Sequence, residues 1–242
     1  MTVDYQNTNF NCLICGSPLE YLLLNEEMTC YYCGKKFSAN VRCNQGHYVC
    51  DACHAKDAYG VITSYLLTTK QNDPMLMAED LMKHPAVKMH GPEHHYLVPA
   101  VLVTAYCHVA GRMGELEHLL NETAKRASIV PGGFCGFYGS CGAGIGTGIY
   151  MSIVTGATPL KIEEWQHANL MTSKSLNDIA LAGGPRCCKR NVMLALKAAV
   201  KFTWDKLAIN IPANGTFICH YQSSNRECLG INCLFFPTKK SI

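Results

Sequence analysis

Residues 130–158 read VPGGFCGFYGSCGAGIGTGIYMSIVTGAT, and this stretch decides how the helices around it can pack. It holds nine glycines. Glycine is used where the backbone turns sharply or where another group approaches it closely. The pattern predicts a loop from residue 131 to about residue 141, followed by a helix over residues 142–154. In that helix, glycines spaced by two residues leave the backbone open to a neighbouring helix or to a ligand.

Two cysteines of this stretch, Cys135 and Cys141, are the first candidates for chemistry. Thiols on a glycine-rich backbone suggest a bound metal, a cluster or a reactive sulfur site. The run GAGIGTG does not indicate a dinucleotide site, because no strand precedes it and its glycine spacing differs from the dinucleotide-binding fingerprint.

Apolar residues at helical spacing predict helices on both sides of this stretch. Asp73 and Pro74 form a helix start that Pro85 brings to an end. After His95 the chain is apolar almost all round to residue 110, which predicts a central, buried helix that begins at Pro92. The predicted fold class is therefore mainly α, with about six to eight helices in a core domain over residues 56–242. Further helices are expected over residues 57–67, 113–129, 158–183 and 185–209.

An N-terminal module, residues 1–55, carries seven cysteines and one histidine in the spacing of metal ligands. The order is C-x2-C-x14-C-x2-C-x9-C-x3-H-x2-C-x2-C, and each C-x2-C pair directs two sulfur atoms at one tetrahedral ion. Short strands between the pairs would make this a double, zinc-ribbon-like module that owes its folding energy to the metals. We expect two zinc ions, bound by Cys12, Cys15, Cys30, Cys33, Cys43, His47, Cys50 and Cys53.

The pairing of these eight ligands stays open in the sequence. The simplest arrangement is sequential, in which the first four ligands bind one ion and the last four bind the other. The rival arrangement is cross-braced, because the spacing also resembles that of RING-like modules. His54 is an alternative to His47, which has the better spacing.

The composition narrows the class of protein. Of 242 residues, 48% are hydrophobic and 16% are charged, which suits a well-buried chain or one that associates with others. No apolar run is long enough for a transmembrane helix, and the first residues do not form a secretory signal. Fifteen cysteines without an export signal predict a cytoplasmic, cysteine-rich protein of a reducing and plausibly anaerobic cell. The net charge of +3 is offset by the zinc thiolates, so nucleic-acid binding is not indicated.

Three histidines, His90, His94 and His95, precede or open the central helix. They suit hydrogen bonding at the helix start, and they also suit anion binding or acid–base chemistry. We take His94 and His95 as candidate catalytic residues. Cys107 and His108 lie deep in the apolar run and are expected in the core.

Cys187 and Cys188 lie in the first turn of the helix that Pro185 opens. The helix dipole and the basic residues around them should lower the pKa of their thiols. Adjacent cysteines rarely bind one metal together, so only one of the two is expected to be a ligand. In the C-terminal tail, Asn214 and Gly215 predict a turn between two short strands.

Three pairs of cysteines outside the N-terminal module could share one inorganic centre, with thiolates supplied by separate segments. A [4Fe–4S] cluster takes about four thiolates, and a third zinc site or a dithiol redox site would use the same residues. Cys219, in an apolar segment, is expected in the core. The candidate ligands of the centre are Cys135, Cys141, Cys187, Cys188, Cys228 and Cys233.

Four motifs together resemble an uncharacterised family, a "domain of unknown function" group found largely in anaerobic archaea and bacteria. They are HGPEHHYLVPA, GGFCGFYGSCGAGIGTG, GGPRCCKR and the terminal C-x8-C-x4-C. Some members of that group stand beside radical-SAM or methyltransferase modules, so the resemblance implies anaerobic metal chemistry and a partner of that kind.

Two hypotheses for the function follow. In the first, the protein uses an iron–sulfur cluster or a thiol site in redox, sulfur-transfer or metal-handling chemistry, and it is an enzyme only if that site is reactive. In the second, it is a non-catalytic adaptor whose zinc module binds a partner protein or RNA. The substrate and the oligomeric state are left open.

Overall fold

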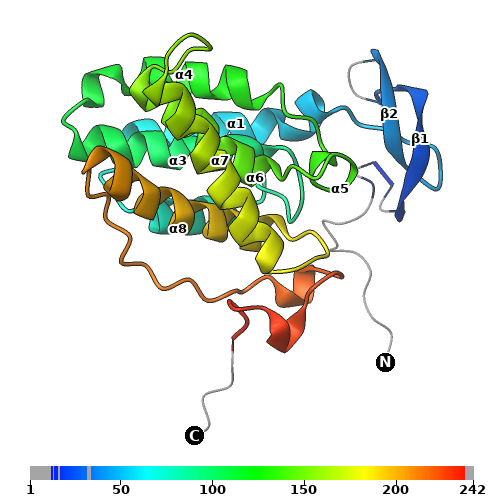
Figure 1. Cartoon of the computed structure of the whole chain (residues 1–242). Helices are drawn as coiled ribbons and strands as arrows, with labels where there is room; N and C mark the ends of the chain where they lie inside the picture. Colours follow the sequence, from blue (N-terminus) through cyan, green and yellow to red (C-terminus); the bar gives the residue numbers. More distant parts are fainter. Residues whose placement is uncertain (1–11, 13, 16, 32–33, 238–242) are drawn as a thin grey trace, which may run out of the picture.

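The computed structural model describes residues 12–237, apart from residues 13, 16 and 32–33. The described part is mainly helical with a small two-stranded sheet (Figure 1). None of the described helices has the length and apolarity needed to cross a membrane. The elements are β1 (Leu19–Thr29), β2 (Lys36–Cys43), α1 (Asp51–Thr68), α2 (Pro74–Lys83), α3 (Glu93–Val109), α4 (Leu116–Ala127), α5 (Phe134–Phe137), α6 (Gly142–Thr155), α7 (Glu163–Leu181) and α8 (Cys188–Leu207), with short 3-10 turns at Met113–Glu115, Gln222–Ser224 and Gly230–Asn232.

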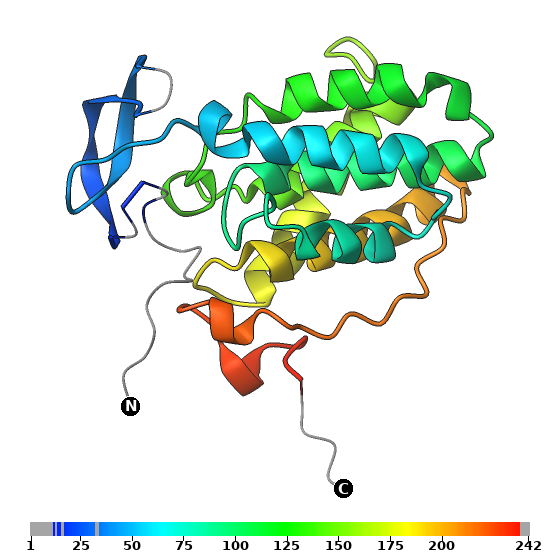
Figure 2. The ribbon, with the colours of Figure 1, turned by 180° about the vertical axis from the view of Figure 1, so that it is seen from behind.

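The sheet is an antiparallel hairpin at one end of the helical bundle (Figures 1 and 2). Its register pairs Leu19 with Cys43 and Thr29 with Lys36, with an irregularity after Tyr21. Most side chains of β1 are exposed and most of those of β2 are half-buried, as expected for a module that builds little core of its own. Helix α1 begins directly after Cys50 and continues into the bundle, so the expected boundary after residue 55 falls inside one continuous helix.

The expected central helix is α3, whose residues are buried almost all round. It packs against α1, α2, α4, α6 and α8, and Pro99 lies within it. Helix α2 also begins as the sequence predicts, because Oδ1 of Asp73 accepts hydrogen bonds from the backbone N–H groups of Met75 and Leu76. The helical core is thus the part of the fold that local patterns predict best.

Alternate glycines of α6 face two different helices. Gly142 and Gly146 are four residues apart and lie against α3, where an added Cβ atom would meet the ring of His95 or that of Pro99. Gly144 and Gly148, each two residues further along the chain, lie on another side of α6. The glycine spacing therefore lets a neighbouring helix approach the backbone, which is one of the two uses expected for it.

The second pair, Gly144 and Gly148, lies against α7. A Cβ atom on either would meet the side chain of Leu176 or Thr172. Because α6 is approached from two sides at once, it can lie between α3 and α7 within the bundle (Figure 1).

Substitution of Gly146 by alanine is expected to destabilise the protein by about 1–3 kcal/mol, because the new methyl group would overfill a packed interface. Its Cβ atom would lie 2.8 Å from Cδ of Pro99 and 3.3 Å from the carbonyl oxygen of His95, and neither group can rotate away. Urea denaturation followed by circular dichroism measures the change.

Gly60 of α1 is the matched control for this prediction. A Cβ atom there would meet nothing within 4 Å. Gly60→Ala should therefore stabilise the chain by about 0.5–1 kcal/mol through helix propensity alone. Equal effects of the two substitutions would contradict the packing role assigned to Gly146.

The expected short β element at the C-terminus is wrong for the described residues. Residues 208–237 form an extended segment that runs back along the bundle and ends in turns near the α7–α8 loop (Figures 1 and 2). The start of α2 ties this segment to the bundle, because Oδ2 of Asp73 accepts hydrogen bonds from the N–H groups of Asn214 and Gly215, at 2.7 and 3.1 Å. The Asn214-Gly215 turn signal therefore marks a contact with α2, not a hairpin.

Candidate metal centres

The first group of metal-binding side chains gathers at the open end of the β-hairpin. The ligand atoms of Cys12, Cys15, Cys43 and His47 all lie within 4.8 Å of one another, so this group could hold a metal ion. The Sγ atoms of Cys15 and Cys43 are 3.9 Å apart, and Nδ1 of His47 lies 3.3 Å from Sγ of Cys15. Hydrogen bonds from the side chain and backbone of Ser17 lower the pKa of the Cys15 thiol to about 6, which favours the thiolate that metals bind.

The second group lies at the other end of the hairpin. The Sγ atoms of Cys30, Cys50 and Cys53 lie within 4.8 Å of one another, and the backbone N–H of Cys50 donates to Sγ of Cys30 at 3.3 Å. Cys33, the fourth ligand that the spacing predicts, lies outside the described residues.

The two groups have the cross-braced arrangement, so the simpler sequential pairing is not the one that the fold makes. The reason is the strand register. Because β1 and β2 are antiparallel, Cys43 at the end of β2 pairs with Leu19 at the start of β1, beside the first cysteines. Cys30, at the end of β1, forms a bridge with Tyr48, close to Cys50.

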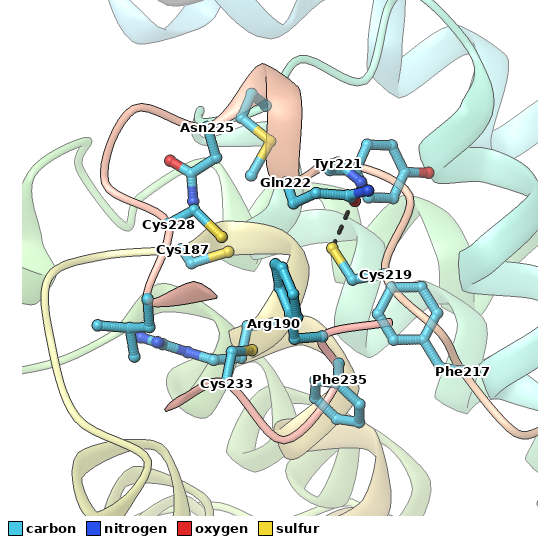
Figure 3. Close-up of a pocket in the computed structure, with 13 residues that line it drawn as sticks. Cys187, Arg190, Phe217, Cys219, Tyr221, Gln222, Asn225, Cys228, Cys233 and Phe235 are labelled. Atoms are coloured by element: carbon cyan, nitrogen blue, oxygen red, sulfur yellow. Dashed lines mark hydrogen bonds between the residues drawn. The ribbon is translucent and has the colours of Figure 1, made fainter. Parts of the chain in front are cut away.

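Four of the later cysteines line one cavity between the start of α8 and the C-terminal segment (Figure 3). Cys187 immediately precedes α8, and the other three belong to the segment that runs back along the bundle. Backbone N–H groups donate to two of the sulfur atoms, from Tyr221 to Cys219 and from Gly230 to Cys228, both at 3.4 Å. The four cysteines are Cys187, Cys219, Cys228 and Cys233.

Cys107 is buried in α3, and the other three later cysteines make up a second set outside the cavity lining. Cys135 lies in α5, Cys141 immediately precedes α6, and Cys188 is the first residue of α8. Burial raises the pKa of the Cys135 and Cys188 thiols, and a negative charge on Cys141 would raise both further. The side-chain amide of Asn191 donates to Sγ of Cys141 at 3.4 Å.

The six candidate ligands of a single centre therefore separate into two sets. Cys187 and Cys188 are consecutive but belong to different sets, so each can serve a different centre. The sequence missed Cys219, which lines the cavity although its apolar neighbours suggested the core. The terminal C-x8-C-x4-C spacing, which begins at Cys219, was the signal that could have found it.

The low thiol pKa expected at the start of α8 is also wrong. Burial raises the pKa of Cys187, and it raises that of Cys188 to about 12. Loss of hydration outweighs the helix dipole and the basic neighbours here, because burial penalises the charged form directly. Without a metal, these two thiols are neutral.

The spacing of the sulfur atoms separates the later sets from the N-terminal groups. In the described part of the chain, the only groups with three or more metal-binding atoms all within 4.8 Å of one another lie in the N-terminal module. A Zn–S bond of about 2.3 Å in a tetrahedral site sets sulfur atoms about 3.8 Å apart. The later sets are wider than one zinc ion needs.

The histidines of the α3 start are held by hydrogen bonds. Nδ1 of His94 lies 3.1 Å from the carbonyl oxygen of Gly91, and Nδ1 of His95 lies 2.9 Å from that of Val130. Burial, with the charge of Lys189, lowers the pKa of His94 to about 3, and burial also lowers that of His95. Both rings are neutral at pH 7, so their candidate catalytic role, which stays a prediction, would be that of a base.

His90 and His54 also lie close to polar partners. Nε2 of His90 lies 3.2 Å from Oδ1 of Asn225, which joins the start of α3 to the C-terminal segment. Nδ1 of His54 lies 3.5 Å from Oε2 of Glu93. His54 belongs to neither of the two metal-binding groups. Of His47 and His54, only His47 belongs to a group that could hold a metal ion.

Comparison with known proteins gives one family. Residues 62–236 match the model of a family of unknown function, DUF5714. The matched region contains both sets of later cysteines and begins after the second group of the N-terminal module. No curated protein and no solved structure matches the chain.

Proposed function

The chain belongs to the DUF5714 family, whose function is unknown, and we propose that it is an iron–sulfur protein with a zinc-stabilised N-terminal module. Each N-terminal group would bind one zinc ion as a closed structural site, with Cys33 as the fourth ligand of the second. The chemistry would reside in the later cysteines, in redox, sulfur-transfer or metal-handling reactions of an anaerobic cell. A radical-SAM or methyltransferase module is the partner that the family resemblance suggests.

The observation that carries the proposal is the cavity lined by four thiols. A [4Fe–4S] cluster is held by four thiolates, each on a different iron, so its ligands stand farther apart than those of one zinc ion. Cys187, Cys219, Cys228 and Cys233 line one cavity, and no three of their sulfur atoms lie within 4.8 Å of one another, as one zinc ion would need. Apolar side chains, among them Met89, Phe217 and Phe235, also line the cavity and would limit the access of water to a cluster.

Two buried, positively charged side chains support the proposal that a negatively charged group binds here. Lys189 and Arg190 follow the two cysteines of α8 directly, and both are buried. In the described part of the chain, their hydrogen bonds go to backbone carbonyl oxygens and to Asn191, not to a carboxylate. Buried charges are normally paired, and a centre with four thiolates would supply the missing negative charge. Burial lowers the pKa of Lys189 to about 8, although the negative charge of the buried Glu93 carboxylate opposes this shift.

The double variant Cys228→Ser/Cys233→Ser is expected to lose the iron and sulfide of one cluster and to keep its zinc. The protein should be purified without oxygen, and its iron, sulfide and zinc should be measured together with the visible spectrum. Cys107→Ala is the matched control, because it removes a buried thiol of α3 that does not line the cavity. A brown wild-type protein whose colour and iron survive the double substitution would refute the assignment.

A second candidate function, the non-catalytic adaptor, is favoured by the surface of the hairpin. Leu23 and Leu24, in β1, are 99% and 79% exposed. Exposed neighbouring leucines are typical of a protein-binding surface. An anaerobic preparation that is colourless and contains zinc alone would favour this function over the first.

A further inference from the structure

We propose that the turn over residues 228–236 is a docking surface for an acidic protein that carries one electron at a time. Two of the four thiols of the cavity belong to this turn, Cys228 and Cys233. The inference rests on the proposed function, since it takes the cavity to hold an iron–sulfur cluster. It adds which kind of partner exchanges electrons with that cluster and where this partner binds.

The number of thiols in the cavity limits the chemistry that a cluster there can carry out. A [4Fe–4S] cluster has four irons, and the four cysteines of the lining supply a thiolate for each. With every iron ligated by the protein, no position stays open for a substrate, in contrast to metal sites that keep one. Such a cluster accepts and releases electrons, so it needs a partner that supplies or takes them.

The turn presents two apolar side chains to solvent. Ile231 is 84% exposed and Leu234 is 60% exposed, while Leu229 and Phe236 of the same turn line the cavity. The turn lies on the outside of the bundle in both views (Figures 1 and 2). A carrier that covers Ile231 and Leu234 would touch the turn that holds two of the ligands, which brings its own redox centre close to the cluster.

Hydrogen bonds hold the turn in this conformation. The backbone N–H of Cys228 donates to the carbonyl oxygen of Asn225 at 3.1 Å. The N–H of Cys233 donates to the carbonyl oxygen of Gly230 at 2.9 Å. Oδ1 of Asn225 lies 3.2 Å from Nε2 of His90, which ties the turn to the start of α3. A surface that is already ordered loses little conformational freedom when a partner binds.

Positively charged side chains stand beside the turn. Arg226, just before it in the chain, is exposed. Lys197 of α8 is also exposed, and its Nζ lies 4.9 Å from the centre of the Phe235 ring. Neither cation forms an ion pair with a carboxylate in the described part of the chain. Oε2 of Glu227, the nearest carboxylate in the sequence, lies 3.4 Å from Nε2 of His90. An acidic surface therefore complements the turn.

The size of the surface indicates a short-lived complex. Ile231 and Leu234 form a small apolar centre, and complexes between electron-transfer proteins bury less area than stable complexes do. Opposite charges at the rim speed the encounter of such partners more than they prolong it. The occupant that fits is an acidic one-electron carrier, which gives one electron to the cluster or takes one from it, with no bond made or broken.

Binding of a [2Fe–2S] ferredoxin, an acidic one-electron carrier, tests the surface. Calorimetry with the full-length chain, prepared without oxygen, should give a dissociation constant that Ile231→Ser/Leu234→Ser raises about tenfold at unchanged iron content. Arg226→Glu should raise it by a similar factor at low salt and by little at about 1 M salt, where charges are screened. Cytochrome c, a basic carrier, should bind more weakly than ferredoxin.

Leu160→Ser/Ile162→Ser is the matched control for the apolar centre. These two side chains are 93% and 89% exposed, and they precede α7, whereas the loop that leads to Cys187 follows it. The 19 residues of α7 place the control about 28 Å from that loop. The control should leave the dissociation constant unchanged. If it weakens binding as much as Ile231→Ser/Leu234→Ser does, ferredoxin does not dock on the turn.

Electron transfer gives a second readout. Mixing reduced ferredoxin with the oxidised chain, or the reverse, should move one electron per cluster, at a second-order rate that Ile231→Ser/Leu234→Ser lowers about tenfold. An iron-containing chain that neither binds ferredoxin nor exchanges electrons with it in either direction would overturn the inference and leave the proposed function standing. A wild-type chain without iron would refute both. A dimer that Ile231→Ser/Leu234→Ser makes monomeric would overturn the inference alone, because a second copy would then cover the turn.

Discussion

The double variant Cys15→Ser/Cys43→Ser is expected to retain one zinc ion per chain, the same number as either single variant. In the cross-braced arrangement, both residues belong to the group that also contains Cys12 and His47, so the second substitution removes nothing more. Sequential pairing would place them on different ions, and the double variant would then retain none. Zinc analysis of the purified variants decides between the two arrangements.

The same variant should lose much of the structure of the hairpin, because a structural zinc site of this type contributes about 10 kcal/mol or more to folding. Cys15→Ser/Cys53→Ser is the matched control, since it removes one ligand from each group and should lose both ions. Retention of one ion by this control would contradict the grouping. The hairpin can be followed by proteolysis between β1 and β2.

Replacement of Asp73 by alanine is expected to lower the free energy of unfolding by about 3 kcal/mol. One carboxylate oxygen caps α2 and the other accepts two N–H groups of the C-terminal segment. Loss of a helix cap costs about 1 kcal/mol, and loss of hydrogen bonds to a buried charged group costs about 1.5–3 kcal/mol. Urea denaturation of the metal-loaded protein measures the change.

Asp73→Asn should lie between the wild type and Asp73→Ala, because an amide oxygen can still cap α2 while its NH2 group faces two donors. Asp178→Ala is the surface control: it removes a pair with Lys174 on α7 and should change stability by less than about 0.5 kcal/mol. If Asp73→Ala is no more harmful than Asp178→Ala, Asp73 does not tie the C-terminal segment to α2.

Most of the helical core follows from local sequence signals. Asp73 with Pro74 marks the start of α2, and the apolar run over residues 92–110 corresponds to α3. Helix α7 begins at Glu163, five residues after the expected Thr158, because a turn follows the proline before the helix is established. The tail was mispredicted because the strand and turn preferences of its residues gave way to contacts with α2.

The candidate sites were only partly predictable for the same reason. Sequence spacing alone identified the ligand types of the N-terminal module. It also identified the later cysteines of both sets, with the exception of Cys219. It could not pair Cys15 with Cys43, or separate Cys187 from Cys188. Those assignments depend on which segments meet in space.

By itself, the amino-acid sequence determined the helices, the metal-ligand spacing and the glycine face of α6, because each depends on residues within a few turns of one another. Only the tertiary structure decided which thiols stand together. The register of β1 and β2 made the N-terminal groups cross-braced, and the return of the C-terminal segment to the start of α8 brought Cys219 beside Cys187. Burial then reversed the expected pKa shifts of Cys187 and Cys188, since hydration is lost only when distant segments pack over a side chain.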